Sequence, residues 1–234
     1  MADMEKVNQK KKLFRQREEG ILSSALSLFL EQGEEYVTVA MIAEKTGIGK
    51  GTIYKHFTSI HEIYLRLLIS YEEELAELFS SISLQDNKDR LAREYFRFRM
   101  QDPKRYALFY RLESKCIQES KLPDLMEKLH KIRLSNIGRL KEIISARIEE
   151  DVLEDVPPYF HMCAAWALVH GAVALYHSDF FGQQIEDKTR FFEFLMDIGV
   201  RMGNRGQYRK SAVVTKEEQK EMQKSEKKAS KGTK

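Results

Sequence analysis

The segment from residue 38 to residue 57 constrains the fold more than any other part of the chain, and its sequence is TVAMIAEKTGIGKGTIYKHF. Val39, Ile42 and Ala43 occupy positions i, i+3 and i+4, which is the spacing of one buried helix face. Gly47 then interrupts the pattern, because glycine can adopt the positive φ that a sharp turn needs. The segment therefore predicts a short helix that ends in a tight turn.

A second short helix is expected over residues 50–56, with Ile53 and Phe57 facing inward. Two short helices joined at a steep angle by a glycine turn form a helix-turn-helix. The outer face of the second helix would carry donors and cations suited to phosphates and base edges: Lys50, Thr52, Tyr54, Lys55 and His56. An ordinary helical hairpin with a polar outer face is the alternative.

Charge near the hairpin favours a polyanionic partner. No Asp or Glu occurs from residue 46 to residue 60, although 32% of the chain is charged. Residues 6–17 also lack acids and contain these cations: Lys6, Lys10, Lys11, Lys12, Arg15 and Arg17. Such a run attracts nucleic acid through counterion release. We therefore predict that the hairpin binds DNA.

Residues 14–64 resemble the DNA-binding head of the TetR family of bacterial repressors. The resemblance rests on the strings TVxxIA and GxxKGTxYxHF, and on these residues before them: Ile21, Ala25, Phe29 and Gly33. The predicted DNA contacts are Thr38, Lys50, Gly51, Thr52, Tyr54, Lys55, His56 and Ser59. The rest of the chain has the family's length and helical character but no motif of its own.

Two positions depart from the family's pattern. Gly49 stands where the family usually has Ser or Thr, so no side-chain oxygen caps the second helix of the motif. Ile60 stands where the family commonly has a Lys that meets a DNA phosphate. Ser59 and Glu62 form a capping-box pattern, and the backbone N–H groups at that helix start can hold a phosphate.

Almost every segment predicts a helix and none alternates with period two, so we predict an all-α fold of about nine helices. The expected helices are 10–32, the two of the hairpin, 59–81, one ending near 100, one beginning at 103, then 123–149, 158–179 and 186–202. We predict a helix-turn-helix DNA-binding domain with a basic arm (1–58), a ligand-binding and dimerisation domain (59–204), and a basic, disordered tail (205–234).

Composition indicates a cytoplasmic protein without a cofactor or metal. The two cysteines lack CxxC spacing, and the N-terminus lacks an apolar signal segment. The most apolar stretch, residues 162–176, is shorter than the about 20 residues of a membrane span, so we expect a buried helix. A metal-dependent helical enzyme is an alternative because of His161, Cys163, His170 and His177, but no catalytic motif accompanies them.

The last two predicted helices carry more apolar side chains than one chain of this size readily covers. We therefore predict a homodimer through a four-helix bundle, an arrangement that the resemblance also implies. The predicted interface residues are Trp166, Val169, Val173, Phe191, Phe194, Leu195 and Ile198. A core within one chain is the alternative.

The body also predicts a small-molecule site. The resemblance implies an inducer pocket whose occupancy moves the helix over 59–81 and hence the DNA-binding heads. The candidate wall residues are Phe96, Phe109, Tyr110, His130 and Trp166, although aromatic residues at helical spacing are also typical of an ordinary core. Their character indicates a largely apolar inducer. The predicted function is thus a repressor released from a palindromic operator, with a nonspecific architectural DNA-binding protein as the alternative.

Overall fold

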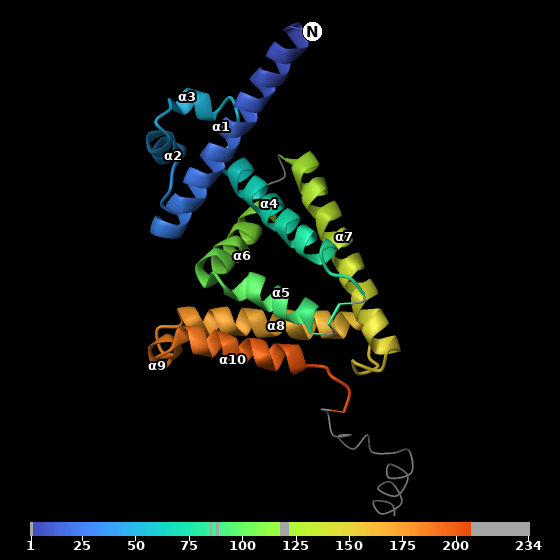
Figure 1. Cartoon of the computed structure of the whole chain (residues 1–234). Coiled ribbons are helices and arrows are strands. Elements are labelled where there is room, and N and C mark those ends of the chain that lie inside the picture. Colours follow the sequence, from blue (N-terminus) through green and yellow to red (C-terminus); the bar gives the residue numbers. More distant parts are fainter. Residues whose placement is uncertain (1, 85, 88, 118–121, 207–234) are drawn as a thin grey trace, which may run out of the picture.

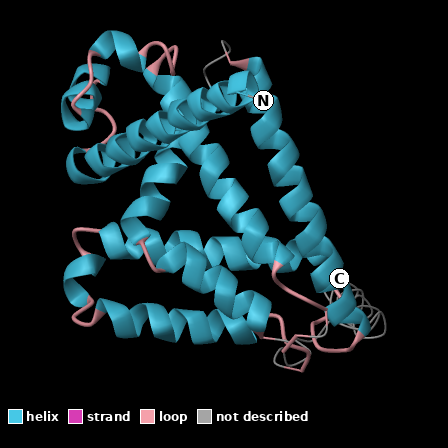
Figure 2. Cartoon of the chain, turned by 45° about the horizontal axis from the view of Figure 1, so that its top comes forward, coloured by secondary structure: helices cyan, strands magenta, loops and turns pink. Residues whose placement is uncertain are grey.

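The computed structural model describes residues 2–84, 86, 87, 89–117 and 122–206. Within this part the chain forms ten helices and no strand, so the predicted all-α fold is confirmed (Figures 1 and 2). Their bounds are α1 Ala2–Gln32, α2 Val39–Thr46, α3 Lys50–Ile53, α4 Ile60–Ser80, α5 Arg90–Met100, α6 Pro103–Ile117, α7 Pro123–Glu149, α8 Pro158–His177, α9 Phe181–Gln184 and α10 Lys188–Arg201. Of the predicted basic tail, residues 207–234 lie outside the described residues.

Two helix boundaries differ clearly from the prediction, and one short helix is added. The first helix begins at Ala2 rather than near residue 10, because the Lys-, Arg- and Gln-rich segment contains good helix formers and no Pro or Gly before Gly20. The second helix of the hairpin ends at Ile53 rather than at residue 56, since a turn follows in which His56 N–H donates to Ile53 O at 2.9 Å. The added short helix α9 lies where we expected a turn.

The helices form a small head and a larger body (Figure 1). Helices α1, α2 and α3 make the head, and α4 packs against α1 and continues into the body. There α7 packs along α4, while α5, α8 and α10 pack together at the far end. Helix α4 therefore runs from the head into the body, and α6 also packs against α1.

Two clusters of buried side chains hold this arrangement. The larger one runs without a break from the head, at Phe29, through Ile63 and Leu67 of α4 to Leu112 of α6. Because the head and the upper body share one core, a shift of α4 relative to α6 disturbs the packing of the head. The smaller cluster lies between α5, α8 and α10.

Close helix packing in the smaller cluster depends on Gly199 of α10. A Cβ atom at this position would lie 2.2 Å from the ring of Phe96 on α5. Only glycine leaves room for the Phe96 ring to lie so close to the α10 backbone. The Phe96 side chain is consequently buried against α10 rather than directed to the middle of the body.

Helix α8 is not the buried helix that the sequence predicted. By length and composition it is the one helix of the described part that could cross a membrane, yet only 17% of its most apolar window is buried. Its fully buried side chains are Val169, Ala172 and Val173. Val169 and Val173 were predicted at the dimer interface, and this is wrong, because both belong to the intrachain core with α5 and α10.

Candidate nucleic-acid interface and ligand cavity

The first helix of the hairpin is fixed at both ends by side-chain and backbone contacts. Thr38 is the N-cap of α2, and its Oγ1 accepts a hydrogen bond from the backbone N–H of Met41 at 3.4 Å. Gly47 ends the helix with a φ of 66°, in the left-handed region. The turn predicted from Gly47 is therefore confirmed, and it sets the direction in which α3 leaves.

The second helix packs its apolar side inward and leaves the opposite side open. Ile53 and, just beyond the helix, Phe57 are buried in the head core. Thr52 is half-buried. Four other predicted contact residues are exposed: Lys50, Gly51, Tyr54 and Lys55. The Lys50 ammonium lies 6.0 Å from the centre of the Tyr54 ring, so a cation and a phenol share one face. Gly49 precedes the helix without a side-chain cap, as its residue type requires.

The predicted outward position of His56 is wrong. Its side chain is buried against α1, where its ring centre lies 4.0 Å from that of Phe14 and its Nδ1 lies 3.8 Å from Glu18 Oε1. The cause is the early end of α3 at Ile53, because the following turn rotates residue 56 toward the head core. His56 thus anchors the hairpin to α1 and is not available to DNA.

The start of α4 is capped by a variant of the predicted capping box. Ser59 Oγ accepts from Glu62 N–H at 3.2 Å, but Glu62 Oε2 accepts from the backbone N–H and the hydroxyl of Thr58, both at 2.8 Å. Burial raises the pKa of Glu62, but hydrogen bonds from Thr58 and Arg66 outweigh burial, so the pKa lies below its usual value. The carboxylate therefore fixes the junction between the hairpin and α4.

The basic segment of α1 adds positive charge next to the hairpin. Its cations are all exposed: Lys6, Lys10, Lys11, Lys12, Arg15 and Arg17. The N-terminal turns of α1 extend past α2 and α3 (Figure 1). At about 1.5 Å per residue, residues 6–17 span roughly 18 Å, which is enough to follow several phosphates.

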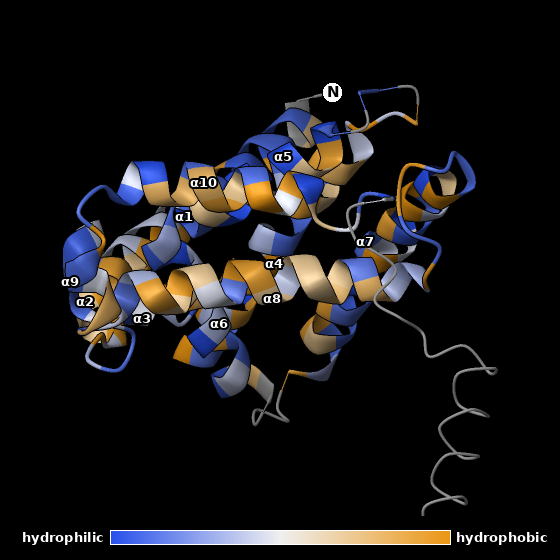
Figure 3. Cartoon of the chain, turned by 90° about the horizontal axis from the view of Figure 1, so that it is seen from below, coloured by the Kyte–Doolittle hydropathy of each residue, from blue (hydrophilic) through white to orange (hydrophobic). Residues whose placement is uncertain are grey.

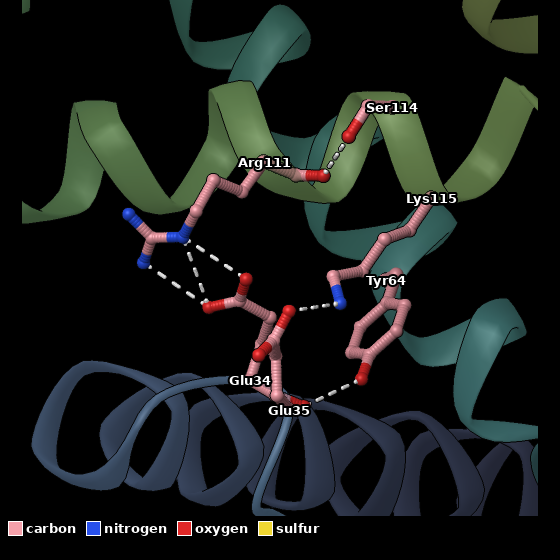
Figure 4. A network of polar contacts seen from close by, with 6 residues as sticks. All are labelled: Glu34, Glu35, Tyr64, Arg111, Ser114 and Lys115. Atoms are coloured by element: carbon pink, nitrogen blue, oxygen red, sulfur yellow. Dashed lines mark hydrogen bonds and ion pairs between the residues drawn. The ribbon is translucent and has the colours of Figure 1, made fainter.

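A polar network joins the head to the body (Figure 4). The Glu34 carboxylate, which is 3% exposed, accepts three hydrogen bonds of 3.0–3.2 Å from the Arg111 guanidinium on α6. Tyr64 of α4 donates its hydroxyl to Glu34 O at 2.9 Å, and Lys115 pairs with Glu35 at 3.2 Å. The loop after α1 is thus tied to both α4 and α6.

A cavity of about 250 Å³ lies in the body, bounded by residues of α4, α5, α6, α7 and α8. Of the predicted wall residues, Phe109, Tyr110 and Trp166 line this cavity. Phe96 instead lines a separate cavity of about 130 Å³ near α10. His130 lines neither and is exposed on α7, so its prediction is wrong. The reason is that Leu129 faces the core, and the next residue of a helix points about 100° away.

The cavity also contains charged residues that the sequence analysis missed, because it considered only aromatic side chains and His130. Arg133 on α7 contacts Glu72 of α4 at 3.3 Å and Glu113 of α6 at 2.8 Å. Asn136 donates to Glu72 Oε2 at 3.2 Å. Arg99 of α5 also lines the cavity. Its helical spacing after two aromatic residues at positions 95 and 96 could have revealed it, since it places the cation on their face.

The histidines considered for a metal site lie apart and have other partners. His170 Nδ1 is 2.6 Å from the Tyr106 hydroxyl, which links α8 to α6. His161 and His177 contact backbone carbonyl groups of Glu154 and Pro103. In the described part of the chain, no three His, Cys, Asp or Glu side chains gather as metal ligands.

An outward-facing hairpin helix on a small helical head, above a helical body with a cavity, defines the class of helix-turn-helix transcriptional regulators. Residues 21–67 match the profile of bacterial regulatory proteins of the tetR family, and residues 89–198 match that of the tetracyclin repressor-like C-terminal domain. The chain belongs to the TetR family of transcriptional regulators.

Individual relatives agree with this assignment. The HTH-type transcriptional regulator TcmR of Streptomyces glaucescens is 28% identical over 154 residues, which cover 64% of this chain and 68% of that protein. The TetR regulator PfmR of Thermus thermophilus shares the fold with a TM-score of 0.60 at 20% identity, over 81% and 96% of the two chains. The regulator FadR of Bacillus subtilis, solved in complex with stearoyl-CoA, shares the fold with a TM-score of 0.55 at 20% identity. The match covers 77% of this chain and 96% of that chain.

Proposed function

We propose that this regulator is a cytoplasmic, non-enzymatic repressor that binds a palindromic operator as a homodimer and is released by a small molecule. The observation that carries the proposal is the placement of α4. One end of this helix shares the head core, and its middle lines the body cavity. A ligand in the cavity and a duplex at the head would therefore act on the same helix.

DNA binding is assigned to the outer face of α3 and the residues around it. Lys50, Gly51, Tyr54 and Lys55 are exposed there, and no acid occurs between residues 46 and 60. Thr38 and Ser59 lie at the starts of α2 and α4, where helix N-termini favour phosphate. The exposed basic segment of α1 adds contacts that do not depend on base sequence.

Dimerisation is assigned to α8 and α10, whose apolar side chains remain uncovered in one chain. Trp166 of α8 is 50% exposed and Phe194 of α10 is 59% exposed. Viewed from below, hydrophobic stretches run along both helices (Figure 3). The other proposed interface residues, Phe191, Leu195 and Ile198, are half-buried on α10. In a dimer, α8 and α10 of one subunit would pack against α8 and α10 of the other. This packing would cover the exposed apolar surface and account for the exposure of α8 in a single chain.

Release is assigned to a movement of α4. Leu68, Tyr71 and Leu75 of α4 line the cavity, and Tyr64 on the same helix holds the loop after α1 through Glu34 O. A ligand that changes the position of α4 would change the position of one DNA-binding head relative to the head of the partner subunit. The two sites are then reciprocally coupled, so the operator weakens ligand binding by the factor with which the ligand weakens operator binding.

The test is selection of duplexes from a random pool followed by gel-shift titration. The proposal predicts a palindromic sequence that is bound at least about 10³-fold more tightly than an unrelated duplex. The exposed basic segment of α1 favours one other function, that of an architectural protein that coats DNA. Equal affinity for all duplexes, with a steep dependence on salt, would support that function and overturn the proposal.

A further inference from the structure

The body cavity contains a cation that forms no ion pair with a carboxylate of the described residues. Arg99 of α5 lines this cavity, and its guanidinium carbon lies 5.0 Å from the ring centre of Tyr71, 5.6 Å from that of Tyr95 and 5.6 Å from that of Tyr106. Its Nε is buried and has no hydrogen-bond partner. None of the ion pairs among the described residues includes Arg99. Its guanidinium group instead interacts with the phenol groups of Tyr71 and Tyr95 and with the ring faces around it.

The other charged groups of the cavity contact one another. Arg133 contacts both Glu72 and Glu113, and Asn136 donates to the second oxygen of Glu72. These contacts occupy the two cavity carboxylates with partners from α7. Glu72, Glu113, Arg99 and Arg133 carry two negative and two positive charges, but both carboxylates contact Arg133. Among the charged residues that line the cavity, Arg99 alone forms no ion pair within the described part of the chain.

The Arg99 guanidinium remains charged in this setting. Burial lowers the pKa of Arg99, but the neighbouring Tyr71, Tyr95 and Glu72 outweigh burial and raise the pKa above its usual value. Burial also lowers the pKa of His170, and the charge of Arg99 lowers it further. A partly buried charge without an anionic partner is costly, because phenol groups and ring faces replace only part of the water that solvates it.

We propose that Arg99 is the anion-binding residue of the cavity and that the ligand is an aromatic acid. The acidic group pairs with the guanidinium, which presents planar, forked donors suited to a carboxylate. This inference deepens the proposed function and rests on the assignment of the cavity as the effector site. It also refines the largely apolar inducer that the sequence predicted, because an apolar ligand would leave Arg99 without an anionic partner.

The aromatic part of the ligand follows from the remaining wall. Rings surround the space on several sides, from Tyr71, Phe79, Tyr95, Tyr106, Phe109 and Trp166. Offset or edge contacts between rings add to the stabilisation that burial provides. A volume of about 250 Å³ is near the lower limit of small-molecule pockets, at about 300 Å³, so a bicyclic acid suits it better than a long acyl chain.

The test compares two probes of equal shape and different charge by isothermal titration calorimetry on the full chain. The probes are naphthalene-2-carboxylate and its neutral amide, naphthalene-2-carboxamide, at pH 7. The variant Arg99→Met removes the charge and keeps the length of the side chain. The matched control Arg97→Met lies on the same helix, where Arg97 is exposed and pairs with Glu94. Circular dichroism establishes that both variants keep their helices.

The wild type is expected to bind the carboxylate about 10- to 100-fold more tightly than the amide, which is the range of charge-assisted hydrogen bonds. Arg99→Met should remove this difference, and Arg97→Met should preserve it. Equal binding of the two probes by the wild type, or no binding of either at millimolar concentration, overturns the proposal without the need for any variant. Because no DNA is present, this result is independent of operator binding, whose failure would instead contradict the proposed function.

Discussion

The contact between Glu34 and Arg111 offers a quantitative test of the link between head and body. The variant Arg111→Met would leave the nearly buried Glu34 carboxylate without its guanidinium partner. Burial raises the pKa of Glu34, but the hydrogen bonds and charge of Arg111 outweigh burial, so the pKa lies below its usual value. Glu34 is therefore ionised at pH 7, and the variant would bury an unpaired charge.

The size of the effect follows from how deeply each partner is buried. Exposed pairs contribute about 0–1 kcal/mol, whereas removing one partner of a fully buried pair costs about 3–5 kcal/mol. The Glu34 side chain is 3% exposed and that of Arg111 is 50% exposed, so the pair lies between these limits. We expect Arg111→Met to lower the free energy of unfolding by about 2 kcal/mol at pH 7, roughly 30-fold in the folding equilibrium.

The assay is urea unfolding at one fixed protomer concentration, because unfolding of a dimer depends on concentration. Because the pKa of Glu34 is lower in the folded state, its ionised carboxylate stabilises the fold at pH values above the pKa of the unfolded state, near 4.5. This contribution is lost as the pH falls through the folded-state pKa. The cost of Arg111→Met should therefore shrink between pH 7 and pH 4. The control Lys115→Met breaks the exposed pair with Glu35 and should cost less than about 1 kcal/mol. A cost below about 0.5 kcal/mol at pH 7, or an equal cost at both pH values, would refute the reasoning.

Three further predictions address the other parts of the molecule. Lys50→Ala should weaken operator binding by about 1–3 kcal/mol in a gel shift, whereas Lys141→Ala, exposed on α7 of the body, should leave it unchanged. Phe194→Glu places a charge on the exposed face of α10 and should convert the dimer to a folded monomer in light scattering; a dimer of unchanged mass would exclude this interface. Ser59→Ala removes the N-cap of α4 and should lower the free energy of unfolding by about 1 kcal/mol, measured by urea unfolding; no change would mean that Ser59 does not stabilise the start of α4.

Local rules predicted the parts of the structure that depend on neighbouring residues. The expected bounds of α4, the turn at Gly47 and the expected starts of α6, α7 and α8 agree with the structure to within one residue. Each of these three helices begins with a proline, so the signal lies within a few residues. The family resemblance is likewise confirmed, because the motif that carries it is local and specific.

Features that depend on packing between distant helices were predicted less well. His56 was placed outward because the second hairpin helix was assumed to continue, and Val169 was placed at the dimer interface because its cover by α5 and α10 is not visible in sequence. His130 was assigned to the cavity by residue type, although its neighbour Leu129 faces the core. That Arg99 forms no ion pair among the described residues emerges only when the partners of the other charged residues are known.

The central claim is that two copies of the outer face of α3 enter the major groove of one duplex. Dimethyl sulfate interference on the selected operator tests this directly, since guanine N7 lies in the major groove and adenine N3 in the minor groove. We predict interference at guanine N7 in two symmetric clusters whose centres are about one helical turn apart, or a multiple of that distance. Interference at adenine N3 alone, or a single unsymmetric cluster, would contradict the account.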